Sequence, residues 1–165
     1  MVGDVLFFKK KNSIISRLIS RLTKSDFTHV ALIIAYDETL NIATVIEANR
    51  LIKTRISKVA VNKENVVYSS GHISDEKLGK ILRFAYKKVG TNYDYLQILG
   101  LFISLIFKGK RSPLFNSTNK FICSELIDLA YFRSGIRRRD LLNLGNITPQ
   151  ELIEEYDLKE VKKGM

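Results

Sequence analysis

The sequence predicts an α+β fold in which a central antiparallel sheet of about five to six strands packs against helices. Two observations support this class. The first half of the chain holds short apolar or alternating runs separated by polar turns, whereas later apolar residues recur at helical spacing. The chain has 165 residues, a natural length for one domain, and no linker or internal repeat interrupts it. We therefore expect a single domain spanning residues 1–165.

The strand signals come first along the chain. Strands are expected at residues 5–8, 27–36, 43–48, 51–56 and 65–68, with a last one near 158–161. Both faces of the run 27–36 are apolar, as in a central strand. A polar turn beginning at Asp37 joins this run to 43–48 and predicts an antiparallel hairpin. Directly opposed residues in that hairpin should have numbers summing to about 77 to 79.

Helical signals alternate with these runs and then dominate. An amphipathic helix is expected from about residue 12 to 22, with Arg17, Arg21 and Lys24 along its basic side. A second helix follows Ser74 as N-cap and stops at Gly90. Its expected buried stripe consists of Leu78, Ile81, Leu82, Ala85 and Val89.

Three more helices are expected in the second half of the chain. The apolar segment from Tyr95 to Phe107 predicts one, and residues 123–133 predict another, capped by Thr118 or Asn119 and ended by Gly135. The last begins with a capping box, in which Thr148 precedes a proline and Glu151 stands three residues on. It should end near Tyr156.

The composition narrows the classes of partner. The net charge of +10 favours an acidic partner, such as an anionic membrane surface, an anionic cell-wall polymer or nucleic acid. A generally solvated basic surface is the alternative. Nucleic acid is the less favoured partner because the chain has no zinc-finger spacing or RNA-binding motif. A single cysteine excludes an internal disulfide and a cysteine-rich zinc site, and no metal or cofactor is expected.

The only cysteine stands at the predicted start of a helix. Polar turn residues precede Cys123, and Ile127 and Ala130 share its helical face. In the first turn, free N–H groups and the positive end of the helix dipole stabilise a thiolate, which is the form a nucleophile needs. The alternative is that Cys123 is only a small buried apolar residue.

A nucleophilic thiol also needs a base and a group that orients that base. His29 begins a rigid strand, and Glu47 lies at the same open end of the predicted hairpin. A carboxylate at the end of an apolar strand needs a partner, and a histidine across the ladder can supply it. His72 lies in a turn and is expected to be exposed. The pattern therefore predicts Cys123 as nucleophile, His29 as base and Glu47 as orienting residue. The Cys123 amide would be one oxyanion donor and the Tyr93 hydroxyl a second.

Several blocks of the chain resemble one family. In chain order, these blocks are Gly3-Asp4-Val5-Leu6, Thr28-His29-Val30-Ala31, Val45-Ile46-Glu47-Ala48, Gly90-Thr91-Asn92-Tyr93-Asp94, Phe121-Ile122-Cys123-Ser124-Glu125-Leu126 and Ile147-Thr148-Pro149-Gln150-Glu151-Leu152. In this order they resemble the permuted papain-like cysteine hydrolases, the YiiX-like branch of the NlpC superfamily. The resemblance implies a papain-like fold, with the histidine and the acid upstream of the cysteine. It matches Cys123, His29 and Glu47 to the triad and Tyr93 to the active-site tyrosine.

These observations favour a cysteine hydrolase that cleaves an amide bond through an acyl-enzyme, in cell-wall-type peptides among other substrates. One alternative is a lipid-directed acyltransferase or esterase at a membrane surface, which the hydrophobic segment 95–107 and the basic charge would suit. Another is a non-catalytic basic module that binds membranes. The substrate is thus peptide-like or lipid-like, and the oligomeric state is left open.

No signal peptide is expected, because the N-terminus lacks a basic stretch followed by an apolar one. The longest apolar run, from Tyr95 to Phe107, is too short to span a membrane. We therefore expect a cytoplasmic protein, with peripheral attachment to a membrane as an alternative.

Overall fold

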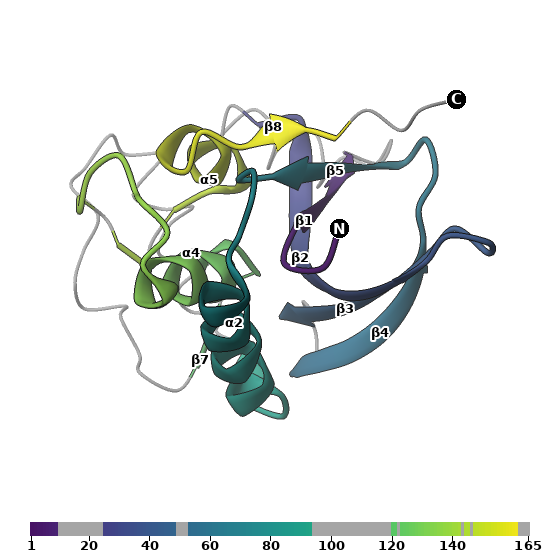
Figure 1. The fold of residues 1–165 in the computed structure, drawn as a ribbon, viewed down its shortest axis with the longest axis horizontal. Coiled ribbons are helices and arrows are strands. Elements are labelled where there is room, and N and C mark those ends of the chain that lie inside the picture. Colours follow the sequence, from purple (N-terminus) through teal and green to yellow (C-terminus); the bar gives the residue numbers. More distant parts are fainter. Residues whose placement is uncertain are drawn as a thin grey trace.

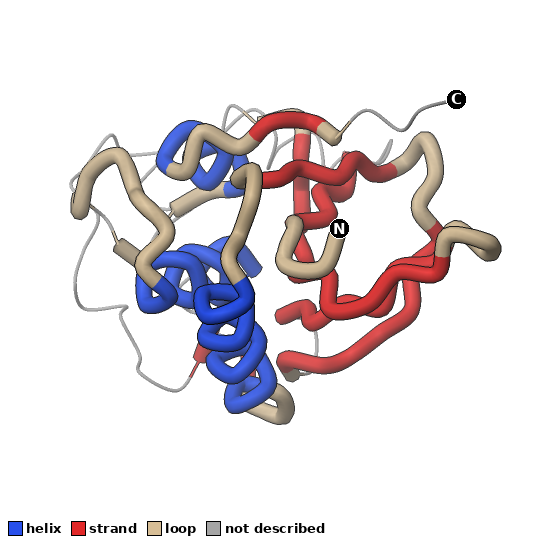
Figure 2. Tube along the Cα trace, in the orientation of Figure 1, coloured by secondary structure: helices blue, strands red, loops and turns tan. Residues whose placement is uncertain are grey.

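The computed structural model describes residues 1–9, 25–48, 53–93, 120–121, 123–142, 144–145 and 147–161. The helices expected at 12–22 and 95–107 lie outside these residues, as do the cap candidates Thr118 and Asn119. Helices gather on one side of the molecule and strands on the other (Figures 1 and 2). No helix in the described part of the chain combines the length and the apolar character that a membrane crossing needs.

One antiparallel sheet of six strands forms the centre of the fold, as the sequence predicts. Its strands are β1 (Val5–Lys9), β2 (Phe27–Asp37), β3 (Ile42–Ala48), β4 (Thr54–Ala60), β5 (Asn65–Ser69) and β8 (Lys159–Glu160). They lie in the order β4-β3-β2-β1-β5-β8, so that β2 and β3 are both interior strands. The short strands β6 (Asn92–Tyr93) and β7 (Lys120–Phe121) form a separate parallel pair.

Three described helices pack beside this sheet: α2 (Asp75–Lys88), α4 (Cys123–Ser134) and α5 (Pro149–Glu155). α5 has the predicted capping box, because the Thr148 side chain accepts from the Glu151 amide while the Glu151 carboxylate accepts from the Thr148 amide. α4 ends at Ser134, and the next residue is Gly135, whose φ of +84° favours a glycine. Both signals were read correctly from the sequence.

Three local predictions need correction. The strand expected at 51–56 runs instead from Thr54 to Ala60, because it pairs along the whole length of β3. Ser74 occupies the N-cap position of α2, but its side chain makes no capping hydrogen bond. Of the predicted buried stripe of α2, only Ile81 and Ala85 are buried, and Val89 is exposed. Only a narrow face of this helix packs against the rest of the described structure.

The sheet is apolar on both faces. On the helix-facing side, Val30 and Leu32 belong to the same buried cluster as Ile127 of α4. Ala31 and Ile33, with side chains on the opposite face, belong to a second cluster. Strand β2 is therefore fixed on both sides, and this rigidity holds the residues at its beginning in place.

Candidate active site

A histidine and a glutamate meet where β2 and β3 leave their common ladder. The register pairs Leu32 with Ile46 and Ile33 with Val45, so the paired numbers sum to 78, within the predicted range. Continued by one residue, this register sets Glu47 one diagonal step from His29 on the same face of the sheet. His29 Nε2 lies 2.7 Å from Glu47 Oε2. The predicted contact between these two residues is present.

The neighbouring strand β4 holds the other oxygen of the same carboxylate. Arg55 is paired directly with Glu47, and its Nε donates to Glu47 Oε1 at 3.0 Å. The Ser57 hydroxyl donates to the same oxygen at 2.8 Å. Glu47 is 6% exposed, and the cost of burying its charge is offset by these donors together with His29.

Sequence reasoning missed both β4 residues. A strand placed at 51–56 ends before Ser57 and gives no register against β3. The usable signal was the alternation of Arg55 and Ser57, two polar side chains on one face of a strand that must pair with the strand carrying Glu47. Once the strand is moved to its observed position, both residues fall beside the carboxylate.

Cys123, from the helical part of the fold, lies next to His29. Cys123 is the first residue of α4 and is buried, and its side chain is hydrogen-bonded to the His29 ring. Ile127 and Ala130, on the same helical face, lie in the core cluster that includes Val30 of β2. Packing of α4 on the sheet therefore brings its first residue to the beginning of β2, where His29 lies.

Backbone amides complete the surroundings of the sulfur. The ladder between β2 and β3 begins at Leu32 opposite Ile46, and the residues of β2 before Leu32 lie beyond it. The backbone amide of Val30, in this stretch, and that of Ser124, in the first turn of α4, both lower the pKa of the Cys123 thiol. Both donors favour a negative charge on sulfur.

The electrostatics of the three groups favour a charged pair. Burial alone would lower the pKa of His29, but the hydrogen bonds and charges of Cys123 and Glu47 outweigh it and raise that pKa to about 9. Burial likewise raises the pKa of the Cys123 thiol, yet its contact with His29 and the two backbone amides leave it below the ordinary value. The contacts of the site therefore favour a thiolate beside an imidazolium.

The same network fixes the charge of the carboxylate. Burial raises the pKa of Glu47, whereas hydrogen bonds from His29, Ser57 and Arg55 lower it to about 2. Because His29 Nε2 is engaged by this carboxylate, Nδ1 is the ring nitrogen left to face the thiol. A proton can thus be held or moved at Nδ1 while Nε2–H stays bound to Glu47.

Tyr93 and His72 are the two remaining candidates from the sequence. The backbone of Tyr93 is in β6 and pairs with Phe121 of β7, two residues before Cys123. Its side chain is outside the described part of the structure, so its expected hydroxyl contact stays a prediction. His72 is exposed, as expected, and lines a pocket together with Arg137 and Arg139.

Comparison with known sequences bears on this geometry. Residues 1–161 match the family described as "Permuted papain-like amidase enzyme, YaeF/YiiX, C92 family". The match covers nearly the whole chain and therefore includes β2, β3 and α4. This chain belongs to the YaeF/YiiX family of permuted papain-like amidases. Its α+β architecture is the papain-like fold, and its general chemistry is that of an amidase-type cysteine hydrolase.

A solved structure shows the same YaeF/YiiX fold. It is the crystal structure of metalloprotein yiiX from Escherichia coli O157:H7, similar at a TM-score of 0.65 and 18% sequence identity. The alignment covers 99% of this chain and 97% of that one. No curated protein matches the chain. In the described part of this family member, no three His, Cys, Asp or Glu side chains are placed to hold a metal ion.

Proposed function

We propose that the protein is a cysteine amidase in which Cys123, His29 and Glu47 form the catalytic triad. The observation that supports this most is the position of His29, whose ring contacts the Cys123 thiol while its Nε2 lies 2.7 Å from Glu47. A nucleophile, a base and an orienting acid are thus connected in one line. Membership in an amidase family gives the reaction class.

In the acylation half, the Cys123 thiolate attacks the carbonyl carbon of the amide and forms a C–S bond. The carbonyl oxygen becomes an oxyanion, for which the Cys123 amide at the start of α4 is the nearest expected donor. Tyr93 is the second proposed donor. When the C–N bond breaks, the proton held at His29 Nδ1 passes to the departing nitrogen, and a free amine leaves.

In the deacylation half, His29 is neutral and acts as the base. It takes a proton from water, which attacks the thioester carbonyl and forms a C–O bond. The C–S bond then breaks, the carboxylic acid leaves, and the Cys123 thiolate faces the imidazolium again. Glu47 remains ionised throughout and stabilises the imidazolium in both halves.

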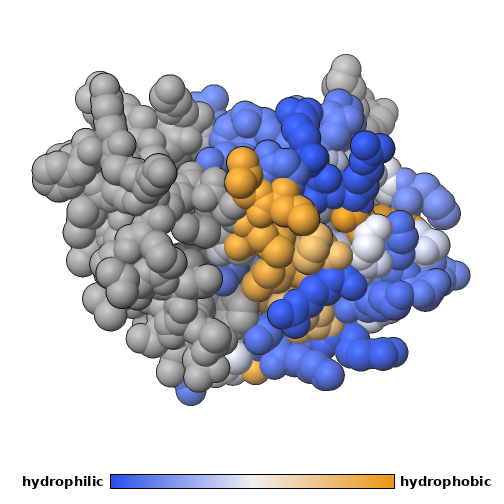
Figure 3. Space-filling view, turned by 90° about the vertical axis from the view of Figure 1, so that its left-hand side faces the viewer, coloured by the Kyte–Doolittle hydropathy of each residue, from blue (hydrophilic) through white to orange (hydrophobic). Residues whose placement is uncertain are grey.

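The proposed substrate is a peptide-like amide, of the kind found in cell-wall peptides. A second candidate is the transfer or hydrolysis of a lipid acyl group, which proceeds through the same thioester. The net charge of +10 and the hydrophobic patch on the surface shown in Figure 3 favour this second candidate. In both cases the acyl group resides on Cys123 as an intermediate.

Intact mass measurement tests the proposal. The protein is incubated with peptides that carry free amino groups, and separately with phospholipid vesicles, then quenched in acid. We expect a mass increase equal to one acyl group, located on Cys123, and its size identifies the substrate class. Cys123→Ala should lose both adduct and product, and His29→Ala should lose product. Product formation that persists at the wild-type rate in Cys123→Ala would overturn the assignment.

A further inference from the structure

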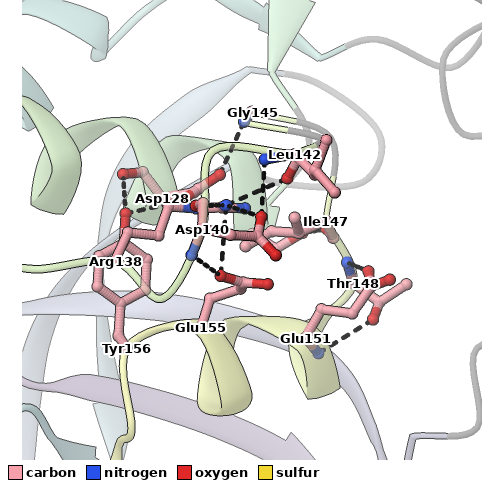
Figure 4. Close-up of polar contacts among 11 residues, drawn as sticks. Asp128, Arg138, Asp140, Leu142, Gly145, Ile147, Thr148, Glu151, Glu155 and Tyr156 are labelled. Atoms are coloured by element: carbon pink, nitrogen blue, oxygen red, sulfur yellow. Dashed lines mark hydrogen bonds and ion pairs between the residues drawn. The ribbon is translucent and has the colours of Figure 1, made fainter.

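The segment that follows α4 is held by a buried arginine. Arg138 is 7% exposed, and its Nε donates to Asp128 Oδ1 of α4 at 3.0 Å. Its Nη1 donates outward along the chain, to the carbonyls of Asp140 and of Leu142, the second at 3.1 Å. Figure 4 shows the guanidinium in the middle of this network. The loop from residue 136 to 142 therefore has a fixed shape.

This fixed loop presents two leucines to solvent. Leu141 is 67% exposed and Leu142 is 73% exposed, more than any other large apolar residue in the described part of the chain. The Leu142 backbone is held from both sides, because its amide donates to Asp140 Oδ1 at 2.7 Å and its carbonyl accepts from Arg138. Leu141 and Leu142 are thus held outward by the backbone bonds of the loop.

The same loop also carries cations. Arg137 and Arg139 are exposed, and with Lys77 of α2 they line a pocket of about 560 Å³. Its two acids are already engaged: Glu155 lies 3.4 Å from Arg138 Nη1, and Asp157 lies 2.7 Å from Lys159 Nζ.

Among the described residues the three cations form no close ion pair, although the charge of Arg139 acts on Asp157 and that of Lys77 acts on Glu76. Lys77, Arg137 and Arg139 are therefore available to an external anion. The face of the molecule that carries this loop shows a hydrophobic patch bordered by strongly hydrophilic residues (Figure 3).

We propose that the loop of residues 136–142 docks the protein on an anionic lipid bilayer. Leu141 and Leu142 enter the boundary between headgroups and acyl chains, while Lys77, Arg137 and Arg139 contact lipid phosphates. Exposed apolar side chains beside unpaired cations are the pattern of interfacial binding, and the net charge of +10 complements an anionic surface. This surface is separate from Cys123, and the inference does not depend on the proposed chemistry.

The loop also returns to the helix that carries Cys123. The Gly145 amide donates to Asp128 Oδ2 at 2.7 Å, and the Ser124 hydroxyl donates to the Ile147 carbonyl. The chain after the docking loop is therefore hydrogen-bonded to α4, and the loop itself is joined to the same helix through Arg138 and Asp128. Bilayer contact at the loop would set the orientation of that helix relative to the membrane.

A fluorescence experiment tests insertion directly, because the chain contains no tryptophan. Leu142→Trp places a single reporter at the loop, and Leu40→Trp places a matched one at another leucine, 65% exposed, in the turn between β2 and β3. With vesicles of phosphatidylglycerol and phosphatidylcholine, emission of the Leu142→Trp protein should shift to the blue. The Leu40→Trp protein should show no shift. A shift in both proteins, or in neither, would overturn the proposal.

Vesicle co-sedimentation measures the two contributions separately. The double variant Leu141→Ser and Leu142→Ser should weaken partitioning at least about tenfold. The double variant Arg137→Gln and Arg139→Gln should weaken it about 25-fold, at roughly fivefold per charge. The exposed pair Lys58→Gln and Lys63→Gln removes the same net charge elsewhere and should change partitioning much less. Equal losses in both charge variants would contradict a localised surface.

Two further outcomes are informative. Cys123→Ala should bind vesicles as the wild type does, which separates docking from catalysis. If wild-type protein does not partition onto anionic vesicles at low salt, the proposal is wrong. It is also wrong if light scattering shows a dimer that dissociates in the Leu141→Ser and Leu142→Ser variant, because the leucines would then bind a second copy of the chain.

Discussion

Glu47 uses its two oxygens for two purposes. Oε2 accepts from His29, while Oε1 is held by Ser57 and Arg55 across the β3–β4 ladder. Because Oε1 is fixed from β4, the carboxylate cannot turn away from the histidine. His29 is thereby held in one tautomer and one ring orientation, which is what a base and acid at Nδ1 needs.

Replacing this carboxylate by an amide should impair the site without unfolding the protein. In Glu47→Gln, one end of the amide carries hydrogens, so either His29 or the β4 pair loses an acceptor. The loss of negative charge also lowers the pKa of His29 from about 9. We expect kcat to fall by roughly 10²–10⁴-fold, and the alkaline limb of the pH profile to move to lower pH. Steady-state kinetics between pH 5 and 10 would measure both.

Glu64→Gln is the matched control, because Glu64 is an exposed glutamate in the turn before β5. It should keep the wild-type rate and profile. If Glu47→Gln has an unchanged rate, Glu47 is only a paired strand residue and the proposed triad loses its third member.

Local patterns in the sequence were enough to bring three of these residues together. Strand periodicity and hairpin register place His29 near Glu47, and the helix start places Cys123. Arg55 and Ser57 were missed because a strand end displaced by a few residues changes which side chains lie opposite Glu47. The Val30 amide carries no sequence signal at all, since any residue supplies it.

Among the elements, α4 and the chain that follows it depend on one buried ion pair. Asp128 is fully buried and accepts from Arg138 Nε at 3.0 Å, from the Gly145 amide at 2.7 Å and from the Tyr156 hydroxyl at 2.7 Å. These donors come from the loop after α4 and from the end of α5. One carboxylate therefore joins the helix that carries Cys123 to the C-terminal part of the fold.

Removing either partner of this ion pair should be costly. Asp128→Ala leaves the Arg138 guanidinium buried without its carboxylate, and we expect about 3–5 kcal/mol of destabilisation. At about 2–4 °C per kcal/mol for a chain of this size, the Tm should fall by roughly 6–20 °C. Calorimetry on the purified variant measures this shift.

The exposed pair of Glu76 and Lys80, 2.6 Å apart on α2, provides the control. Lys80→Gln should leave the Tm almost unchanged, because surface ion pairs contribute little. Asp128→Leu combined with Arg138→Met should recover part of the loss, since no unpaired charge is then buried. An Asp128→Ala protein that melts with the wild type would show that the network does not stabilise the fold.

The sequence did not predict this network. The run Arg137-Arg138-Arg139 gives no sign that only its middle member is buried. That distinction arises from the direction in which the loop leaves α4, which long-range packing decides. The capping box of α5 was predictable because all of its partners lie within four residues of each other.

For the molecule as a whole, the site couples folding stability to pH. The Glu47 pKa is about 2 in the folded protein, below its ordinary value of 4.5. The carboxylate therefore stabilises the fold fully above about pH 4.5 and loses that contribution as the pH falls towards 2. His29 is protonated in both folded and unfolded chains across this range and adds no change there.

Comparison with Glu47→Gln isolates this effect. We expect the difference in free energy of unfolding between wild type and variant to shrink by roughly 2–3 kcal/mol between pH 5 and pH 2. Urea titrations at several pH values measure it, and Glu64→Gln should track the wild type throughout. If the difference in free energy of unfolding between wild type and Glu47→Gln stays constant down to pH 2, Glu47 is not held as a carboxylate by its neighbours.

The rate of alkylation of Cys123 by iodoacetamide, followed from pH 5 to 10, tests the central claim most directly. Cys123 is the only cysteine, so total labelling reports this one thiol. We expect the folded wild type to react at pH 6 faster than the same protein unfolded in urea, because its thiolate is stabilised by His29. In His29→Ala the reaction should become slow below about pH 8.5. If the folded wild type and His29→Ala are labelled equally slowly at pH 6, and faster only at alkaline pH, the thiolate–imidazolium pair is contradicted and with it the catalytic site.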